Sequence, residues 1–338
     1  MSDDLHRRLS NFVDWIATDS EREEDLRDRA NNIRKSISTK AKDDSLVVRA
    51  TPSSGSFATR TGLRRHMRGE SEVEGQDVDV PFVVAPKTKD EERVESLLAR
   101  FDTYAAESHL DTERETTKSS VKLKFTDNVN YDLVPMFATK DPERQIIVRS
   151  DGERRETSVQ KHVEFVRSRT QKSKATPGCV AFNDMVRLLK WWRCFREAEG
   201  RTVKELPSFL ITLLAAHAFD HRGVRAKYGE TMADWLGFLA RQVRRRARIG
   251  FNDFAAAQRA PSAPSGQVWE VYDPVNSENN VVDKWSGVMC DELGGWLDDS
   301  RDAMYEAIVA FDDDRENDGV ECLVRVFGAP VRHHSEGD

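Results

Sequence analysis

The stretch that decides the fold is PSSGSFATRTGLRRHMRGESEVEGQDVDVPFVV, residues 52–84. It ends in a near-continuous apolar run, which predicts a central strand of a sheet. Asp77 and Asp79 stand two residues apart in that strand, so both carboxylates project from one face. Two carboxylates side by side repel each other unless a positive charge lies between them, so the pattern indicates a bound cation.

A third carboxylate, Asp132, lies in the apolar run VNYDLVPMF of residues 129–137. Residues 119–127 and 129–139 predict two successive strands that pair antiparallel. If the strand of Asp132 also neighbours that of Asp77 and Asp79, the three carboxylates converge, and magnesium is the cation that such hard oxygen ligands prefer. The alternative is that the aspartates lie at exposed strand ends and have no shared role.

The composition describes an ordinary soluble globular protein. The chain has 338 residues, of which 38% are hydrophobic and 33% charged, with a net charge of −7. No apolar run is long enough for a membrane span, and the N-terminus lacks the apolar block of a secretory signal, so we expect a cytoplasmic protein. The net negative charge argues against a protein that coats nucleic acid. The four widely spaced cysteines predict free thiols, without a metal site or disulfide framework.

The fold class predicted is α+β, with a mixed sheet in the N-terminal half and helices in the C-terminal half. Residues 1–155 form the sheet-containing core, with N-terminal helices over 3–41 spanning both lobes, and 66–76 as a polar loop. Residues 156–330 form the helical domain, and 331–338 a flexible tail. A cleft between the halves is the natural ligand site.

The order of motifs, Gly55-Ser56 followed by Asp77, Asp79 and Asp132, resembles the polymerase-β-like nucleotidyltransferases. The resemblance implies that the glycine-serine pair holds a nucleoside triphosphate and that the three carboxylates ligate two Mg²⁺ ions, with Mn²⁺ as an alternative. Backbone N–H groups beside a glycine can approach phosphate oxygens closely. One departure is that 20 residues, 57–76, separate the pair from the first aspartate, which is longer than the commoner pattern of the superfamily.

Two later segments narrow the resemblance. Residues 185–219 are similar to the helical segment of the 2′-5′ oligoadenylate synthetases and of cyclic GMP-AMP synthase, and VYDPVNSENNV, residues 271–281, is similar to a D-P-x-x-x-x-x-N segment of the same group. The match implies that Lys190 and Ser208 contact the triphosphate and that Phe209 stacks on a base. Taken without the family, Lys190 reads as a solvated lysine and Phe209 as a core residue. These segments resemble those of the bacterial CD-NTases, which are oligonucleotide cyclases of anti-phage operons. The resemblance implies a polymerase-β-like palm followed by a helical domain of the oligoadenylate-synthetase type.

The resemblance implies an enzyme that joins nucleoside triphosphates, ATP first among them, into a cyclic di- or trinucleotide and releases pyrophosphate. Alternatives are a linear oligonucleotide or RNA-end nucleotidyltransferase, a catalytically silent nucleotide sensor, or a purely structural protein. No His/Cys zinc ribbon is present, so activation by DNA is not expected. The family also implies an operon-encoded regulator, or a ligase that acts on the C-terminal tail. Arg241, Arg244, Arg245 and Arg248 are predicted to share one helical face, as a solvated surface or as a grip on polyphosphate or a partner.

Overall fold

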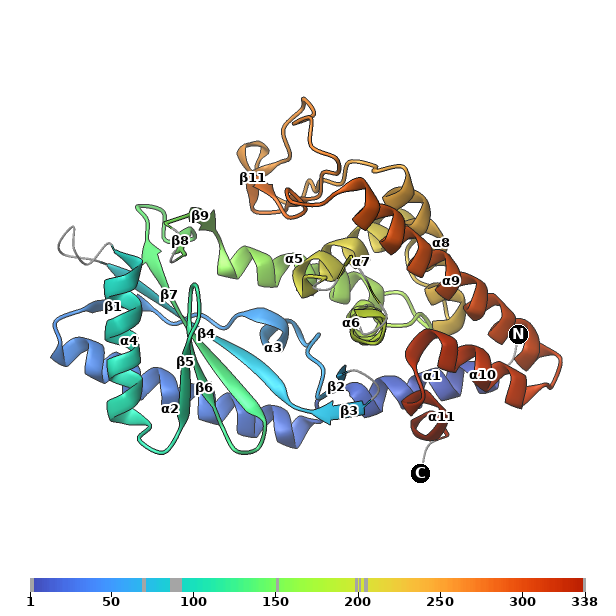
Figure 1. Ribbon diagram of the computed structural model, residues 1–338, viewed down its shortest axis with the longest axis horizontal. Coiled ribbons are helices and arrows are strands. Elements are labelled where there is room, and N and C mark those ends of the chain that lie inside the picture. The colour runs from blue at the N-terminus through green and yellow to red at the C-terminus, as the bar shows by residue number, and fades with distance from the viewer. Residues whose placement is uncertain are drawn as a thin grey trace. The chain divides into compact units, whose positions relative to one another are not determined.

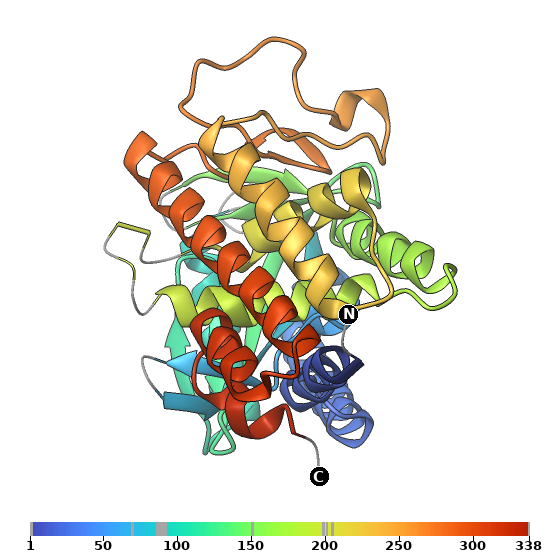
Figure 2. The same ribbon diagram turned by 90° about the vertical axis from the view of Figure 1, so that its right-hand side faces the viewer.

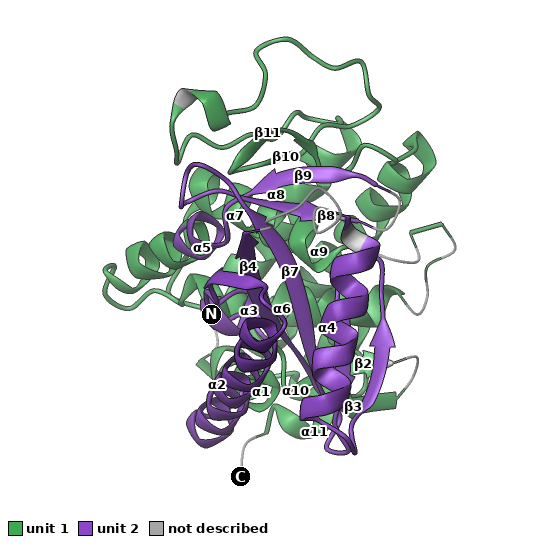
Figure 3. Cartoon of the chain, turned by 90° about the vertical axis from the view of Figure 1, so that its left-hand side faces the viewer, with its two compact units in different colours: residues 1–17, 63–73, 165–338 green, residues 18–62, 74–164 purple. Residues whose placement is uncertain are grey.

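The computed structural model describes residues 3–68, 71–85, 93–149, 152–197, 200, 202–203 and 206–336. The chain divides into two compact units, coloured in Figure 3. Unit 1 contains residues 1–17, 63–73 and 165–338, and unit 2 contains residues 18–62 and 74–164. The boundary between the halves therefore falls at residue 164, later than the predicted residue 155. Unit 1 also takes in the first helix, whose apolar stripe belongs to the helical core.

Unit 2 is built on a mixed seven-stranded sheet. Five strands follow the order β1-β4-β7-β6-β5, and β8 pairs with both β7 and β9. Only the β4–β7 pairing is parallel among these strands, as the described residues have them. The strands are β1 (Val47–Ala50), β4 (Gln76–Ala85), β5 (Glu113–Thr116), β6 (Val121–Lys124), β7 (Val129–Ala138), β8 (Gln145–Val148) and β9 (Arg154–Thr157). The predicted mixed sheet and the antiparallel pairing of β6 with β7 are confirmed.

Two helices, α2 (Ser20–Asp43) and α4 (Val94–Ser108), pack on one face of this sheet, as Figure 1 shows. The strongly charged α2 begins at Asp19, whose side chain accepts a hydrogen bond from the N–H of Arg22 at 2.7 Å. Its few apolar residues recur at helical spacing and form one buried stripe against the sheet: Leu26, Ala30, Ile33, Ile37 and Ala41. The opposite face of the sheet is thereby left for the polar side chains.

The predicted loop over residues 66–76 was wrong. Two short strands, β2 (Arg65–Arg68) and β3 (Ser71–Glu74), pair in a separate two-stranded sheet. Met67 is buried in the core of unit 1, which gives the segment an apolar anchor that its polar composition hides. The inserted residues between Gly55-Ser56 and Asp77 thus carry structure of their own.

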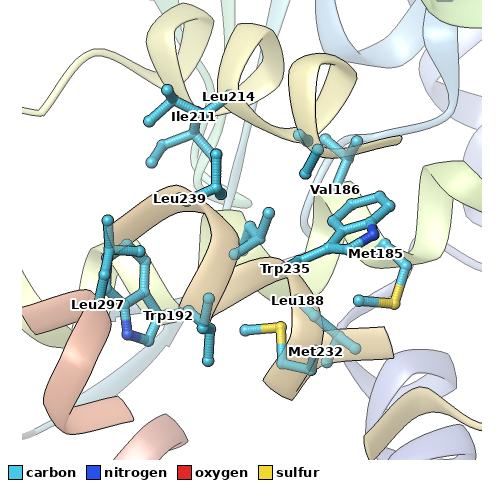
Figure 4. Close-up of a cluster of buried hydrophobic side chains, with 14 of the residues drawn as sticks. Met185, Val186, Leu188, Trp192, Ile211, Leu214, Met232, Trp235, Leu239 and Leu297 are labelled. Atoms are coloured by element: carbon cyan, nitrogen blue, oxygen red, sulfur yellow. The ribbon is translucent and has the colours of Figure 1, made fainter. Parts of the chain in front are cut away.

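Unit 1 is mainly helical. Its helices are α1 (Asp3–Ile16), α6 (Phe182–Glu197), α7 (Ser208–Arg222), α8 (Tyr228–Arg244), α9 (Gly287–Asp312), α10 (Glu316–Phe327) and α11 (Pro330–His334), together with most of α5 (Val159–Lys174), the turn η1 (Ala256–Gln258) and the strands β10 (Tyr272–Asp273) and β11 (Asn276–Asn280). Helices α8 and α9 lie side by side in Figure 2. Figure 4 shows the core that these helices share, with Trp192, Trp235 and Leu297 among its side chains. Trp192 donates a hydrogen bond to the hydroxyl of Ser300 at 2.8 Å, so its indole N–H is satisfied inside the core.

The arginine-rich segment does not form one helical face. Helix α8 ends at Arg244, and Arg245–Arg248 continue as turn and loop. Three of the arginines make ion pairs within unit 1: Arg244 with Asp298, Arg246 with Asp291, and Arg248 with Glu270. The segment therefore ties the end of α8 to its neighbours, which the charge pattern alone did not indicate.

The predicted flexible tail was also wrong over residues 331–336. Val331 and Ser335 are fully buried, and the Ser335 hydroxyl accepts a hydrogen bond from Arg8 of α1 at 3.2 Å. The ring of His334 stacks on Trp15 of α1, with ring centroids 3.8 Å apart. The packed residues 331–336 are a poor substrate for a ligase. Residues 337–338 lie outside the described residues, so the joining of the tail's last residues to a partner stays a prediction.

Two features of the described residues concern the cysteines and the hydrophobicity of the helices. All four cysteines are free thiols. Among the residues that the structure describes, no helix has the length and apolar character that crossing a membrane requires.

A buried histidine in α7 predicts a pH-dependent stability. Burial, followed by the neighbouring His221, lowers the pKa of His217 to about 4. Between pH 6.5 and 4 this histidine is protonated in the unfolded chain but neutral in the folded protein. The stability that the neutral form contributes is therefore fully present above this range, and it is lost as the pH falls through it. When the pH is lowered from 7 to 5.5, we expect the free energy of unfolding of wild type to fall by about 1 kcal/mol more than that of His217→Asn.

Urea unfolding at pH 7.0 and 5.5 measures this loss in wild type and variant. The exposed His333→Asn is the control and should keep the wild-type dependence. Equal losses in wild type and His217→Asn would contradict the assignment of a neutral buried imidazole.

Candidate active site on strands β4 and β7

The parallel pairing of β4 and β7 brings carboxylates from two strands into one place. Asp79 stands opposite Asp132 in the register, and Asp77 stands opposite Asn130. Since neighbouring strands are about 4.8 Å apart, Asp79 and Asp132 are adjacent across the pair. The convergence of the carboxylates depended on these two strands being neighbours, and the structure pairs them.

The alternation along both strands decides which side chains face inward. Val78 and Val80 of β4, with Leu133 of β7, are buried against the helices α2 and α4. Because side chains alternate between the two faces of a strand, Asp77 and Asp79 project from the opposite face. The apolar residues thus hold the strands in the core while the carboxylates are presented on the other side of the sheet.

A lysine of the next strand lies among these carboxylates. Lys122 of β6 is the register partner of Asp132, and its ammonium is 3.5 Å from Asp132 Oδ2 and 3.3 Å from Asp77 Oδ1. Asp77 Oδ1 also accepts a hydrogen bond from Asn130 Nδ2 at 3.0 Å. One positive charge therefore bridges two carboxylates that come from two strands.

Burial distinguishes the carboxylates from each other. The Asp132 side chain is only 16% exposed, whereas that of Asp77 is 62% exposed. Burial raises the pKa of the Asp132 carboxyl, although Lys122 and a 3.0 Å hydrogen bond from Ser120 act in the other direction. For Lys122, burial opposes the charge, but attraction to Asp132 and Asp77 outweighs it and the pKa of the ammonium is raised. The ammonium thus stays charged, and it does not fully compensate the lost hydration of Asp132.

Gly55 touches the second carboxylate directly. It has φ of +67°, and a Cβ on this residue would lie 2.0 Å from Asp79 Oδ2. No side chain fits there, so the glycine is required both by the left-handed backbone and by the close approach of the carboxylate. Gly55 is 24 residues before Asp79 in the sequence, yet the two residues are in direct contact in the fold.

Ser56 follows in the first turn of α3 (Gly55–Thr59). Its carbonyl accepts a hydrogen bond from the N–H of Thr61 at 2.9 Å, which closes the turn after the helix. The first N–H groups of a helix have no acceptor within it and are available to a ligand. Gly55 and Ser56 thus lie at the start of a helix, directly beside the carboxylate of Asp79.

The donor set suits a magnesium ion, because aspartate oxygens are the hard ligands that Mg²⁺ prefers. The described residues contain no group of three or more His, Cys, Asp or Glu side chains arranged to hold a metal ion. At this site the cation between Asp77 and Asp132 is the ammonium of Lys122. The predicted binding of Mg²⁺ by these carboxylates stays a prediction, and in this structure Asp77 and Asp132 pair with a cation that the protein itself supplies.

The remaining predicted residues belong to unit 1. Lys190 is buried on α6 and is 6% exposed, and Ser208 is exposed at the first position of α7. Phe209 is partly buried against the helical core. Within unit 1, α6 and α7 pack against each other. The interpretation of Lys190 as a solvated lysine is therefore wrong.

The D-P-x-x-x-x-x-N segment forms the hairpin of β10 and β11. Asn280 accepts hydrogen bonds from the N–H groups of Val271 and Val282 and donates one to the carbonyl of Trp269. Asp273 accepts one from the N–H of Val275 at 2.9 Å. Both ends of this motif thus hold the local backbone in place.

Sequence reasoning missed three residues of the site: Ser120, Lys122 and Asn130. Residues 121–124 read VKLK, in which the two lysines alternate with buried apolar residues and so share one face of the strand. This alternation was the available signal. The pattern places Lys122 and Lys124 on the same strand face and does not distinguish them. Only the pairing of β6 with β7 shows that Lys122 lies beside Asp132.

Comparison with known proteins supports the nucleotidyltransferase interpretation. Residues 4–169 match the family described as Second Messenger Oligonucleotide or Dinucleotide Synthetase domain. A curated relative, the cyclic AMP-AMP-AMP synthase of Escherichia coli (strain MS 115-1), is 25% identical over 90% of this chain and 92% of its own length.

Solved structures share the fold over nearly the whole chain. CdnC of E. coli MS115-1, solved with ATP, has a TM-score of 0.78 at 23% identity and covers 96% of this chain and 98% of that one. The complex of E. coli MS115-1 CdnC with HORMA-deltaN gives a TM-score of 0.77 at 23% identity, covering 96% and 97%. The palm sheet and the helical part are thus a known combination.

Proposed function

Since this chain belongs to the CD-NTase family of nucleotidyltransferases, which synthesise cyclic oligonucleotide second messengers, we propose that it makes an adenine-containing cyclic di- or trinucleotide from ATP. The observation that carries the assignment of its active site is the parallel register of β4 and β7, which sets Asp79 beside Asp132 and shares one ammonium between Asp132 and Asp77. The choice of ATP is supported by the relative named cyclic AMP-AMP-AMP synthase and by the CdnC structure with ATP.

In this proposal, Asp77, Asp79 and Asp132 hold two Mg²⁺ ions, for which Mn²⁺ is an alternative. The family is metal-dependent, and bound divalent ions would polarise the α-phosphate and lower the pKa of the attacking hydroxyl. The carboxylates would determine the positions of the metal ions, and the backbone N–H groups of Gly55 and Ser56 would donate hydrogen bonds to the triphosphate.

The reaction requires positioning more than covalent help from the protein. A ribose 2′- or 3′-hydroxyl attacks the α-phosphate of a second nucleotide, the P–O bond to the leaving pyrophosphate breaks, and the hydroxyl proton is lost to solvent. A second transfer within the same site closes the ring. No side chain of this chain needs to form a bond to the substrate.

Three residues of unit 1 are also assigned to nucleotide binding, from the family resemblance. We assign Lys190 and Ser208 to the triphosphate and Phe209 to a base, on the resemblance of α6 and α7 to the helical segment of oligoadenylate synthetases. Lys190 is only 6% exposed, which excludes a solvated surface lysine and supports a specific role. Lys190→Met should then raise KM for ATP more than it lowers kcat.

A product assay tests the proposed function. The purified protein is incubated with labelled ribonucleoside triphosphates and Mg²⁺ or Mn²⁺, then treated with phosphatase, and the label is analysed by mass. We expect a phosphatase-resistant adenine-containing product without free ends. A resistant product with a free end would identify a linear transferase instead, and bound nucleotide without turnover under all conditions, including added regulator, would identify a silent sensor.

A protein regulator is part of the proposal. The structurally similar CdnC was solved in complex with HORMA-deltaN, which supports an operon-encoded protein partner for this chain as well. We place the enzyme in the cytoplasm, where nucleoside triphosphates are abundant, and in anti-phage signalling. Activation by DNA is not part of the proposal.

A further inference from the structure

Lys122 occupies the position of a cation among the proposed metal ligands, and nothing in the carboxylate motif predicts it. Its side chain is only 23% exposed, and it reaches both Asp77 Oδ1 and Asp132 Oδ2 from the neighbouring strand β6. Of the two lysines that share this face of β6, Lys124 pairs with Glu113 and Glu115 of β5. The two lysines are therefore alike in sequence and differ in their partners.

We propose that Lys122 is a resident counter-cation, which holds the carboxylates together in the metal-free enzyme and is displaced when a divalent ion binds. This inference rests on the proposed function in one respect, the assignment of Asp77, Asp79 and Asp132 as metal ligands. It adds a group with which the metal must compete, and so a device that sets the metal affinity of the enzyme.

The hydrogen bonds of Asp132 show why displacement is required. Oδ2 faces the ammonium of Lys122, while Oδ1 accepts a hydrogen bond from Ser120 at 3.0 Å. Oδ1 of Asp77 in turn is shared by Lys122 and Asn130. A divalent ion that bridged Asp77 and Asp132 would stand close to the ammonium, and like charges a few ångströms apart repel strongly. The flexible four-carbon stem of lysine allows the ammonium to move away.

Charge counting explains why the ammonium is present at all. Three carboxylates on adjacent strands carry three negative charges, and one of them is largely buried. Without a counter-charge these groups repel each other and weaken the strand pairs that present them. The single positive charge of Lys122 leaves the three carboxylates with a net negative charge. A divalent ion carries twice the charge of the ammonium, so the carboxylates attract it more strongly than they attract Lys122.

The test measures Mn²⁺ binding to the nucleotide-free protein by electron paramagnetic resonance. We expect Lys122→Gln to bind Mn²⁺ about tenfold more tightly than wild type, because the competing charge is gone. Lys122→Arg keeps a positive charge and should bind no more tightly than wild type. Lys124→Gln, with the same loss of charge on the same strand face, is the matched control and should retain the wild-type affinity.

Thermal unfolding supplies a second readout. In the absence of metal, Lys122→Gln should melt below wild type, and Mn²⁺ should raise its melting temperature by more than it raises that of wild type. Lys124→Gln should show neither difference. This readout also establishes that the variant is folded before its metal affinity is interpreted.

The outcomes separate this inference from the proposed metal site. Equal Mn²⁺ affinity in wild type and Lys122→Gln, or weaker binding in the variant, would overturn the role of Lys122 and leave the metal site standing. If neither protein binds Mn²⁺ above the level of an Asp77→Asn/Asp79→Asn double variant, the metal site itself fails, and the inference fails with it.

Discussion

Replacing Asp77 and Asp79 together by asparagine abolishes turnover while leaving a folded protein: this is the largest effect that we expect. Asparagine keeps the shape of each side chain but removes two of the negative charges that we propose to hold a divalent ion. Loss of the electrostatic stabilisation supplied by such an ion corresponds to a fall in kcat of about 10³-fold or more. Pyrophosphate release from ATP, followed with a coupled assay, measures the fall directly.

The same double variant should be at least as stable as wild type without metal. Its charge change removes repulsion among carboxylates that face a single ammonium, and that repulsion is the cost of presenting them together. Glu113→Gln with Glu115→Gln is the matched control, because it removes two negative charges from β5, which pairs with β6, without touching Asp79 or Asp132. Retention of pyrophosphate release by the aspartate variant would refute the assignment of these residues.

Gly55→Ala should have the second largest effect. Its added Cβ would lie 2.0 Å from Asp79 Oδ2, so either the carboxylate or the backbone before α3 must move. A displacement of about 1 Å in an active site lowers the rate by about 10²-fold. The left-handed backbone adds a stability cost of about 1–2 kcal/mol for any residue with a Cβ.

Gly178→Ala separates the two consequences. Gly178 also has a positive φ, of +74°, but a Cβ there would meet nothing within 4 Å. We expect this control to lose stability to a similar extent and to keep its activity. Steady-state kinetics and thermal unfolding on both variants test the difference, and equal activity in the two would show that the contact between Gly55 and Asp79 does not matter for catalysis.

The carboxylate side of the site was largely accessible from the sequence because its rules are local. A period of two along DVDV places Asp77 and Asp79 on one face, and the buried Val78 and Val80 between and after them confirm that alternation. The antiparallel pairing of β6 with β7 follows from a short connection. Each of these inferences depends on residues that are close together in the chain.

What the sequence could not supply is register and long-range packing. Lys122 and Lys124 are equivalent by pattern, and only the pairing with Asp132 and Asn130 distinguishes them. The arginines after α8 looked helical, because nothing local marks Arg244 as the last helical residue. The tail looked mobile since its composition is polar, and its burial depends on Arg8 and Trp15, more than 300 residues earlier.

The pairing of the last residues with the first helix has a consequence for synthesis of the chain. Helix α1 is synthesised well before its partners, because Phe12 packs against Trp191 and Phe327, which both come much later in the chain. Domains generally fold as units during synthesis. The sheet of unit 2 lies between α1 and these partners in the chain, so it can fold before the apolar stripe of α1 is buried. A chain terminated before Phe327 would carry the proposed metal-binding carboxylates without a finished helical unit.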